Sequence, residues 1–96
     1  MIAFIDDYNK SCKIGMTIGE KEQWGMGYGK EALIELIRYS FEDLGMNRIG
    51  AEIFQFNERS IKLFEQCGFQ REGVERELVY KDGKFKDQYI YGLLRK

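Results

Sequence analysis

The spacing of apolar residues changes from a repeat of two to a repeat of about 3.6 residues across one glycine-rich stretch. Before it, every second residue of the segment 12–18 is apolar: Cys12, Ile14, Met16 and Ile18. After it, apolar residues recur on one side of a helix: Ala32, Leu33, Leu36, Ile37, Phe41 and Leu44. Between the two patterns, Gly25, Gly27 and Gly29 stand at every second position. The chain is therefore predicted to pass from a strand through a glycine turn into an amphipathic helix.

A glycine turn that opens a helix is suited to bind an anion. The first helical turn carries backbone N–H groups without internal partners, together with the positive end of the helix dipole, and phosphate is a frequent ligand there. The dinucleotide fingerprint is excluded because Lys30 stands where its third glycine belongs, and the P-loop is excluded because Glu31 follows Gly29-Lys30. The alternative is a strand-to-helix turn that binds no ligand. The sequence of this stretch alone is compatible with an anion site and with such a turn.

The remaining patterns complete the order β-β-α-β-α-β-β in one domain. The strand-like segments are residues 1–5, residues 12–18, residues 48–56, a stretch that begins at residue 69 and includes 74–80, and residues 85–94. A helix connects the segments 12–18 and 48–56, so these two strands are expected to be parallel. We therefore expect a mixed sheet of the α/β (α+β) class.

Local signals bound the helices and one hairpin. Gly45 is expected to stop the first helix, which runs from Lys30 to Leu44. Asn57 is a good N-cap for a second helix, which Gly68 ends. Between the last two strands, Asp82-Gly83 is a strong signal for a two-residue hairpin turn.

Composition excludes several classes of function. The 96 residues carry a net charge of −1 and lack the basic footprint of a nucleic-acid-binding protein. Histidine is absent, which excludes histidine-based acid–base chemistry and the commonest transition-metal ligand. Cys12 and Cys67 lie too far apart in sequence for a Cys-x-x-Cys site, so we expect no metal and two reduced thiols. No apolar run reaches membrane-spanning length and no signal peptide precedes the first strand, so we expect a cytoplasmic protein without a membrane partner.

Three stretches keep the motif order of a known family: residues 9–15 at the strand, residues 24–33 at the turn and helix, and residues 57–69 in the second helix. Together they resemble the GNAT superfamily of acetyl-CoA-dependent N-acetyltransferases. The closest likeness is to the branch that acetylates ribosomal-protein N-termini and related small amines, and residues 72–74 and 82–87 add to it. The resemblance covers nearly all of residues 1–96 and implies the C-terminal portion of an acyl-CoA N-acyltransferase (GNAT) domain.

The likeness implies a binding site for acetyl-CoA or CoA. The family's pyrophosphate loop reads Gln/Arg-x-x-Gly-x-Gly/Ala; Gly27 and Gly29 match its two glycines, whereas Trp24 replaces the Gln or Arg. The pantetheine arm would lie between the parallel strands and pair with the backbone of one of them, and two residues of the second helix would touch the cofactor. The implied cofactor residues are Met16, Thr17, Ile18, Trp24, Gly25, Met26, Gly27, Tyr28, Gly29, Asn57 and Phe64. For Asn57 the alternative is a plain N-cap, which is compatible with cofactor contact.

Two departures from the family bear on catalysis. In the family, a tyrosine of the second helix can protonate the departing CoA thiolate; here that position is Phe64, which has no proton to give. Lys13 stands where this branch usually carries a glutamate on the strand. The remaining candidates for a base are Glu20, Glu22, Glu52 and Asp87. Each of these is alternatively a solvated surface carboxylate.

The family domain normally begins with a further strand and two helices that build much of the acceptor pocket. This chain would then be truncated at its N-terminus, and the uncovered sheet edge and apolar face lead us to expect a homo-oligomer such as a dimer, or a partner that supplies the missing layer. The expected function is acetyl transfer from acetyl-CoA to a primary amine, either a peptide N-terminus or a small amine. The alternatives are a catalytically weak or inactive relative that binds CoA or associates, and an unrelated small α/β binding module.

Overall fold

The computed structural model describes residues 2–14 and 28–95, and within them the predicted order β-β-α-β-α-β-β and the mixed α/β class are confirmed. The elements are β1 (Ile2–Asp6), β2 (Ser11–Ile14), α2 (Tyr28–Arg38), the π-helical turn η1 (Tyr39–Asp43), β3 (Arg48–Phe54), α3 (Glu58–Gln66), β4 (Gln70–Lys81) and β5 (Lys84–Leu94). Gly25 and Gly27 of the glycine turn and the second half of the predicted strand 12–18 lie outside the described residues.

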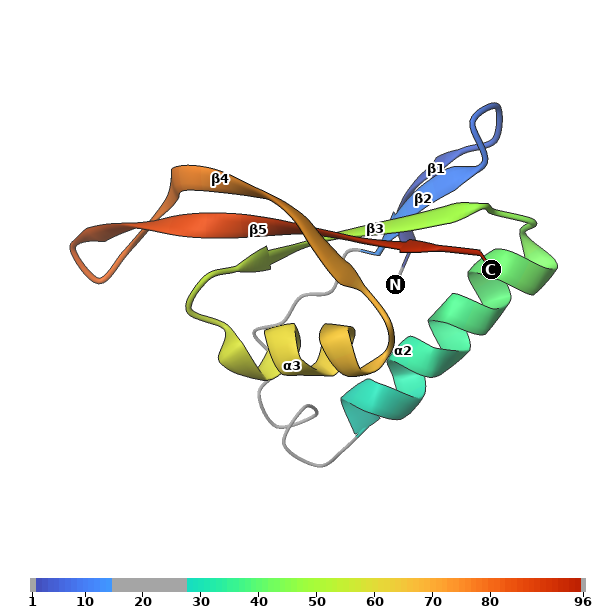
Figure 1. The fold of residues 1–96 in the computed structure, drawn as a ribbon, viewed down its shortest axis with the longest axis horizontal. Helices are drawn as coiled ribbons and strands as arrows, with labels where there is room; N and C mark the ends of the chain where they lie inside the picture. The colour runs from blue at the N-terminus through green and yellow to red at the C-terminus, as the bar shows by residue number, and fades with distance from the viewer. Residues whose placement is uncertain (1, 15–27, 96) are drawn as a thin grey trace.

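The strands form one sheet in the order β1-β2-β3-β5-β4 (Figure 1). β2 and β3 are parallel, with Cys12 opposite Ile49 and Ile14 opposite Ala51, and the other neighbouring pairs are antiparallel. The predicted parallel pairing is therefore confirmed. Its cause is the crossover, because a chain that leaves β2 and returns through α2 re-enters the sheet in the same direction.

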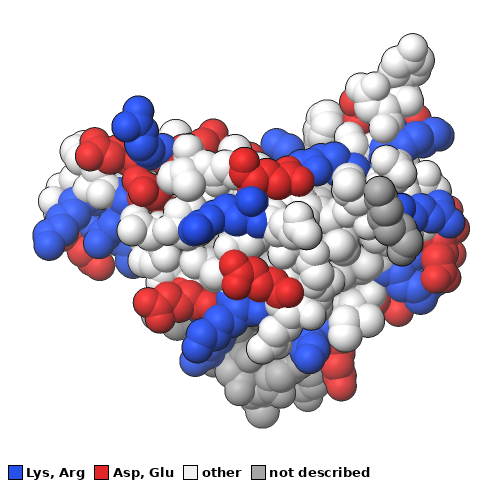
Figure 2. Space-filling model, viewed as in Figure 1, with Lys and Arg blue, Asp and Glu red and all other residues white. Residues whose placement is uncertain are grey.

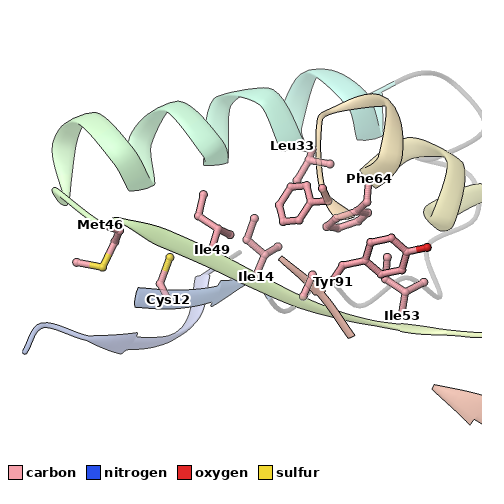
Figure 3. Packing of buried hydrophobic residues seen from close by; sticks show 10 residues of the cluster. Cys12, Ile14, Leu33, Met46, Ile49, Ile53, Phe64 and Tyr91 are labelled. Carbon is pink, nitrogen blue, oxygen red and sulfur yellow. The ribbon is translucent and has the colours of Figure 1, made fainter. Parts of the chain in front are cut away.

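Both described helices lie on the same face of the sheet (Figure 1). The strand side chains that face them are apolar, and together with side chains of the helices they form one buried core (Figure 3). Its members are Cys12, Ile14, Leu33, Met46, Ile49, Ala51, Ile53, Phe64, Phe69 and Tyr91. Phe64 of α3 is 1% exposed, and its ring meets Phe69 edge-on with 5.0 Å between the ring centroids. Aromatic pairs in this geometry gain free energy beyond the area they bury.

The opposite face of the sheet carries charged side chains beside exposed apolar ones such as Phe54 and Leu94. Arg48 of β3 and Glu72 of β4 form an ion pair there, with 2.9 Å between Nη1 and Oε2. The Arg48 guanidinium lowers the pKa of the Glu72 carboxyl from its ordinary value. A Cβ atom on Gly92 of β5 would overlap both side chains, so the glycine leaves the room that the ion pair occupies.

The first helix differs from its prediction at both ends. It begins at Tyr28 rather than Lys30, and its last turn is π-helical, because the Leu44 N–H donates to the Tyr39 carbonyl five residues back at 3.0 Å. The apolar repeat does not reveal this turn, since a single wide turn shifts the pattern by only about one residue. Gly45 follows with φ of 70° and ends the helix, as predicted.

The hairpin between β4 and β5 turns at Asp82-Gly83, as predicted, with φ values of 55° and 76°. Positive φ at both turn residues is the type I′ geometry, whose twist matches that of the two strands. β4 (Gln70–Lys81) agrees within one residue at each end with the strand predicted from residue 69 through 80, and its register against β5 shifts at two places. Glu77, with φ of 53°, lies in the second shift, and its N–H donates to Asp87 Oδ1 at 2.9 Å.

Replacing Phe64 by alanine is expected to lower the free energy of unfolding by about 3–5 kcal/mol, because the change removes a buried ring and leaves a cavity. The same truncation at Tyr8, which is 93% exposed, is the control and should change it by less than about 0.5 kcal/mol. Urea denaturation followed by circular dichroism measures both values. Equal unfolding midpoints for the two variants would contradict the placement of Phe64 in the core.

Candidate functional site

The carboxyl ends of β2 and β3 are where a ligand is expected in a sheet of this topology. In open α/β sheets, ligands bind outside the carboxyl ends of parallel strands, next to the helices that follow those strands. β2 leads through residues 15–27 to α2, and β3 leads to α3. This region, comprising Ile14, residues 51–54 and the first turns of α2 and α3, is termed the carboxyl-end site.

The first turn of α2 contributes amides and a positive charge to this site. Gly29 is buried in that turn, and the first N–H groups of a helix have no partner within it. Burial raises the pKa of the Cys67 thiol, and the nearby Lys30 ammonium opposes that rise. The start of α2 therefore lies close to the end of α3. Free amides and a lysine at one corner suit a phosphate group.

The start of α3 is capped by Asn57, as predicted. Its Oδ1 accepts a hydrogen bond from the Ser60 N–H at 3.3 Å. The Ser60 hydroxyl is buried and has no hydrogen-bond partner in the part of the chain that the structure describes. An unpaired buried hydroxyl costs about 1–3 kcal/mol. This orphaned polar atom beside the cap is compatible with a site that receives a polar cofactor.

A tyrosine does lie next to Phe64, on β5. Tyr91 is fully buried beside it (Figure 3), and its hydroxyl donates to the Glu65 carboxylate at 2.8 Å. Burial, followed by this hydrogen bond, raises the pKa of Tyr91 to about 12. The Tyr91 hydroxyl is thus already hydrogen-bonded within the protein, and the Phe64 side chain has no hydroxyl group.

Lys13 and Glu52 meet across the parallel strands, on the sheet face away from the helices. Lys13 Nζ lies 3.3 Å from Glu52 Oε2, and the two side chains are 55% and 45% exposed. In the register, Lys13 stands opposite Gly50, and a Cβ atom added to that glycine would lie 3.7 Å from Lys13 Cγ. The lysine side chain therefore leans along β3 toward its carboxyl end.

The other described carboxylate candidate, Asp87, has a structural role. Its Oδ1 accepts the hydrogen bond from Glu77 in β4, and its own N–H donates to Gln55 Oε1 at 2.9 Å. Asp87 thus joins the irregular part of β4 to the segment after β3. The structure gives Glu52 and Asp87 different partners and does not assemble them into one pair.

The described cofactor candidates fall on the two helices. Tyr28 and Gly29 begin α2, Asn57 caps α3, and Phe64 lies on the inner side of α3 in the core. The other predicted site residues lie outside the described residues: Met16, Thr17, Ile18, Glu20, Glu22, Trp24, Gly25, Met26 and Gly27. The sequence did not reveal the Lys13–Glu52 or Tyr91–Glu65 contact, because 39 and 26 positions separate the partners.

Over residues 2–14 and 28–95, no three Cys, Asp or Glu side chains gather as they would around a metal ion. In the same part of the chain, no helix combines the length and hydropathy needed to cross a membrane. Figure 2 shows Lys and Arg interspersed with Asp and Glu over the face in view. That face therefore lacks the continuous basic surface that follows nucleic-acid phosphates.

The sequence matches the acetyltransferase (GNAT) domain over residues 2–70. The chain belongs to the GNAT acetyltransferase family. It is 38% identical over 92 residues to the uncharacterized N-acetyltransferase p20 of Bacillus licheniformis, covering 96% of this chain and 51% of that protein. It is 35% identical over 83 residues to the ribosomal protein uS5-alanine N-acetyltransferase of Escherichia coli, covering 86% and 42%.

Solved structures of GNAT acetyltransferases share this fold. The spermidine/spermine N-acetyltransferase SpeG of Vibrio cholerae superposes with a TM-score of 0.85 at 25% identity, covering 97% of this chain and 54% of that one. A probable acetyltransferase superposes with a TM-score of 0.84 at 33% identity, covering 98% and 52%. The chain spans about half the length of the curated relatives it matches.

The high pKa of Tyr91, about 12, can be tested because an ordinary tyrosine ionises near pH 10. The stabilisation of the folded state that the raised pKa of Tyr91 provides is complete below about pH 10. It is lost as the pH rises to about 12, because over this range the unfolded chain binds fewer protons than the folded chain does. Tyr91→Phe should therefore remove the latest of the tyrosinate transitions in an ultraviolet absorbance titration and make the loss of stability over this range shallower.

The control for this titration is Tyr8→Phe, since Tyr8 is 93% exposed and outside the core. This variant should keep the late transition. A late transition that persists in Tyr91→Phe would contradict the assignment.

Proposed function

We propose that the chain forms the acetyl-CoA-binding part of an N-acetyltransferase that moves an acetyl group to a primary amine. The observation that supports the proposal is the parallel pair β2–β3, each strand of which is followed along the chain by a helix, in a member of the GNAT family. GNAT acetyltransferases use acetyl-CoA as co-substrate, which supplies the activated acetyl group.

The backbone amides of residues 24–29 hold the pyrophosphate where α2 begins. The helix dipole contributes about 0.3–1 kcal/mol, whereas each charge-assisted hydrogen bond from an amide contributes about 1.5–3 kcal/mol. Several amides therefore outweigh the Gln or Arg side chain that Trp24 replaces. We propose that the backbone of residues 16–18 pairs with the pantetheine amides and that Asn57, the cap of α3, touches the cofactor arm, while Phe64 supports α3 from the core.

The reaction depends on positioning rather than on an enzyme nucleophile. A neutral amine attacks a thioester directly when the two are held in contact, so the absence of histidine does not prevent it. Glu52, which is 45% exposed and pairs with Lys13, is one described candidate to receive a proton. Asp87 already accepts a backbone hydrogen bond. Glu20 and Glu22 stay further candidates.

The names of two relatives support a proposal for the acceptor class. One is named for the alanine of ribosomal protein uS5, and another for spermidine and spermine. A peptide N-terminus and an aliphatic polyamine share a primary amine as the group that can be acetylated. We therefore propose a primary amine of either kind as the acceptor.

A second function, CoA binding without efficient turnover, is supported by Phe64, which cannot protonate the departing thiolate. Self-association also stays a prediction. It is supported by Phe4 and Ile5 of the edge strand β1, which are 56% and 45% exposed. Apolar side chains on an edge strand favour contact with another chain.

Gly27→Asp is expected to abolish binding of acetyl-CoA, because the new carboxylate would face the pyrophosphate with a like charge. Isothermal titration calorimetry of the variant should show at least about a tenfold loss of affinity, which corresponds to about 1.4 kcal/mol. Tyr8→Asp, which adds the same charge at a side chain that is 93% exposed in the β1–β2 turn, is the control and should bind as the original chain does. Normal binding by Gly27→Asp would show that another segment holds the pyrophosphate.

Turnover separates the two proposed functions. We expect thiol release from acetyl-CoA in the presence of a peptide with a free N-terminal alanine or of spermidine, and the Gly27→Asp variant should lose it. Thiol release that is equally fast with the Gly27→Asp variant would contradict enzymatic transfer. Binding without release across a panel of primary amines would favour the second function.

A further inference from the structure

We propose that copies of this chain bind one another head to tail, with the tip of the β4–β5 hairpin of one copy on the last turn of the first helix of the next copy. The inference is independent of the proposed function, because it uses described residues alone and requires no bound acetyl-CoA. It assigns two surfaces that are separate from the edge strand β1. These two surfaces lie at opposite ends of the longest axis of the molecule (Figure 1).

The first surface is a face of the β4–β5 hairpin on which lysines lie beside aromatic rings. Lys81 is paired with Lys84, and Lys86 follows two positions later on β5, so the three side chains share one face. The Lys81 Nζ lies 5.1 Å from the centroid of the Phe56 ring, and that centroid is 5.2 Å from the one of Phe54. The two phenylalanines are 36% and 41% exposed. We term these five residues the hairpin surface.

The lysines of the hairpin surface are unfavourably placed within their own chain. Like charges directly opposite each other on neighbouring strands destabilise a sheet, and Lys81 and Lys84 form such a pair. Lys81 Nζ lies 4.0 Å from the Asp82 carboxylate, and among the described residues Lys84 and Lys86 form no ion pair. Residues 81–86 therefore keep a net charge of +2 at the tip of the hairpin.

The second surface is the end of the first helix, where α2 passes into η1. Arg38 forms ion pairs with three carboxylates, those of Glu35, Glu42 and Asp43, at N–O distances of 2.6, 3.5 and 3.2 Å. One guanidinium neutralises only one of the three charges, so this group keeps a net charge of −2. The Tyr39 side chain, in the same turn, is 40% exposed. We term these five residues the helix-end surface.

The negative charge of the helix-end surface is also at the unfavourable end of the helix. The helix dipole places partial negative charge at the carboxyl terminus, where cations stabilise a helix and carboxylates destabilise it. The last turn, η1, contains Glu42 and Asp43 but no basic residue. Each surface therefore carries the charge that the other needs, with exposed aromatic side chains beside it. Complementary charges of this kind select a partner and fix how it is oriented.

A contact between two different surfaces is heterologous, so it repeats from copy to copy and forms a ring or an open chain. The charges at both ends are exposed and the aromatic side chains are few, so each contact is expected to be weak and sensitive to salt. The distance over which charges act falls from about 10 Å at 0.1 M salt to about 3 Å at 1 M.

Sedimentation velocity of the purified full chain over a range of concentrations measures this association. We expect oligomers that grow with protein concentration at low ionic strength and dissociate as salt is added. Lys84→Glu/Lys86→Glu reverses the charge of the hairpin surface and should weaken association at least about tenfold. Glu42→Lys/Asp43→Lys reverses the helix-end surface and should weaken it by a similar factor.

The decisive experiment mixes these two variants in equal amounts. Each alone should stay monomeric, because its two surfaces then carry charges of the same sign. The mixture should associate again, because the acidic hairpin of one variant meets the basic helix end of the other. Circular dichroism establishes that both variants are folded. Lys84→Gln/Lys86→Gln, which removes the charge without reversing it, replaces the hairpin variant if that variant fails to fold, and should also weaken self-association.

The matched control is Arg59→Glu/Lys62→Glu, which reverses two exposed charges of α3 and changes the net charge by the same amount as the hairpin variant. This control should associate as the original chain does. An equal loss of association in the control would overturn the proposal by showing that net charge alone is responsible.

Three further results would also overturn it. They are an original chain that is monomeric at low ionic strength, folded variants that associate as the original chain does, and a mixture of the two folded variants that stays monomeric. The last result would indicate contact between two hairpins, contact through β1, or an acidic segment of a different protein as the partner of the hairpin.

Discussion

The parallel pairing of β2 with β3 is the interaction on which the rest of the structure depends. It places Cys12, Ile14, Ile49 and Ala51 on the face that the helices cover. A register shift by one residue would turn Lys13 toward the core, because successive side chains of a strand point to opposite faces. Burying an unpaired charge is costly, so the alternation of apolar and charged residues holds the register. The helices α2 and α3 can pack on the sheet only while that register is kept.

The two faces of the sheet consequently differ in chemistry. One face is an apolar core that includes Phe64 and Tyr91, and the other carries the ion pairs Lys13–Glu52 and Arg48–Glu72. Ion pairs with this much exposure contribute only about 0–1 kcal/mol to stability. Their importance lies in the charges that they hold at defined places along β3. A face of this kind can approach an amine acceptor, whereas the core face cannot.

The same topology places the helix starts at the site. Each parallel strand is followed by a helix, so the start of α3 lies near the carboxyl end of β3, and α2 begins after the segment that leaves β2. Asn57 caps α3, and the first amides of α2 have no helical partner. The fold is shared with SpeG at a TM-score of 0.85 despite 25% identity. Packing of an alternating sheet under two helices is therefore compatible with different sequences.

Local signals in the sequence determined the element order, the parallel pair and the turns. Asn57 caps its helix, Gly45 ends one, and Asp82-Gly83 makes the hairpin, because each needs only its neighbours to adopt its geometry. The tertiary structure alone decided the Lys13–Glu52, Arg48–Glu72 and Tyr91–Glu65 contacts, which join residues 39, 24 and 26 positions apart. Such contacts depend on strand register and on how each helix lies over the sheet. No local pattern encodes them, so these contacts became visible only when the strands and helices were placed side by side.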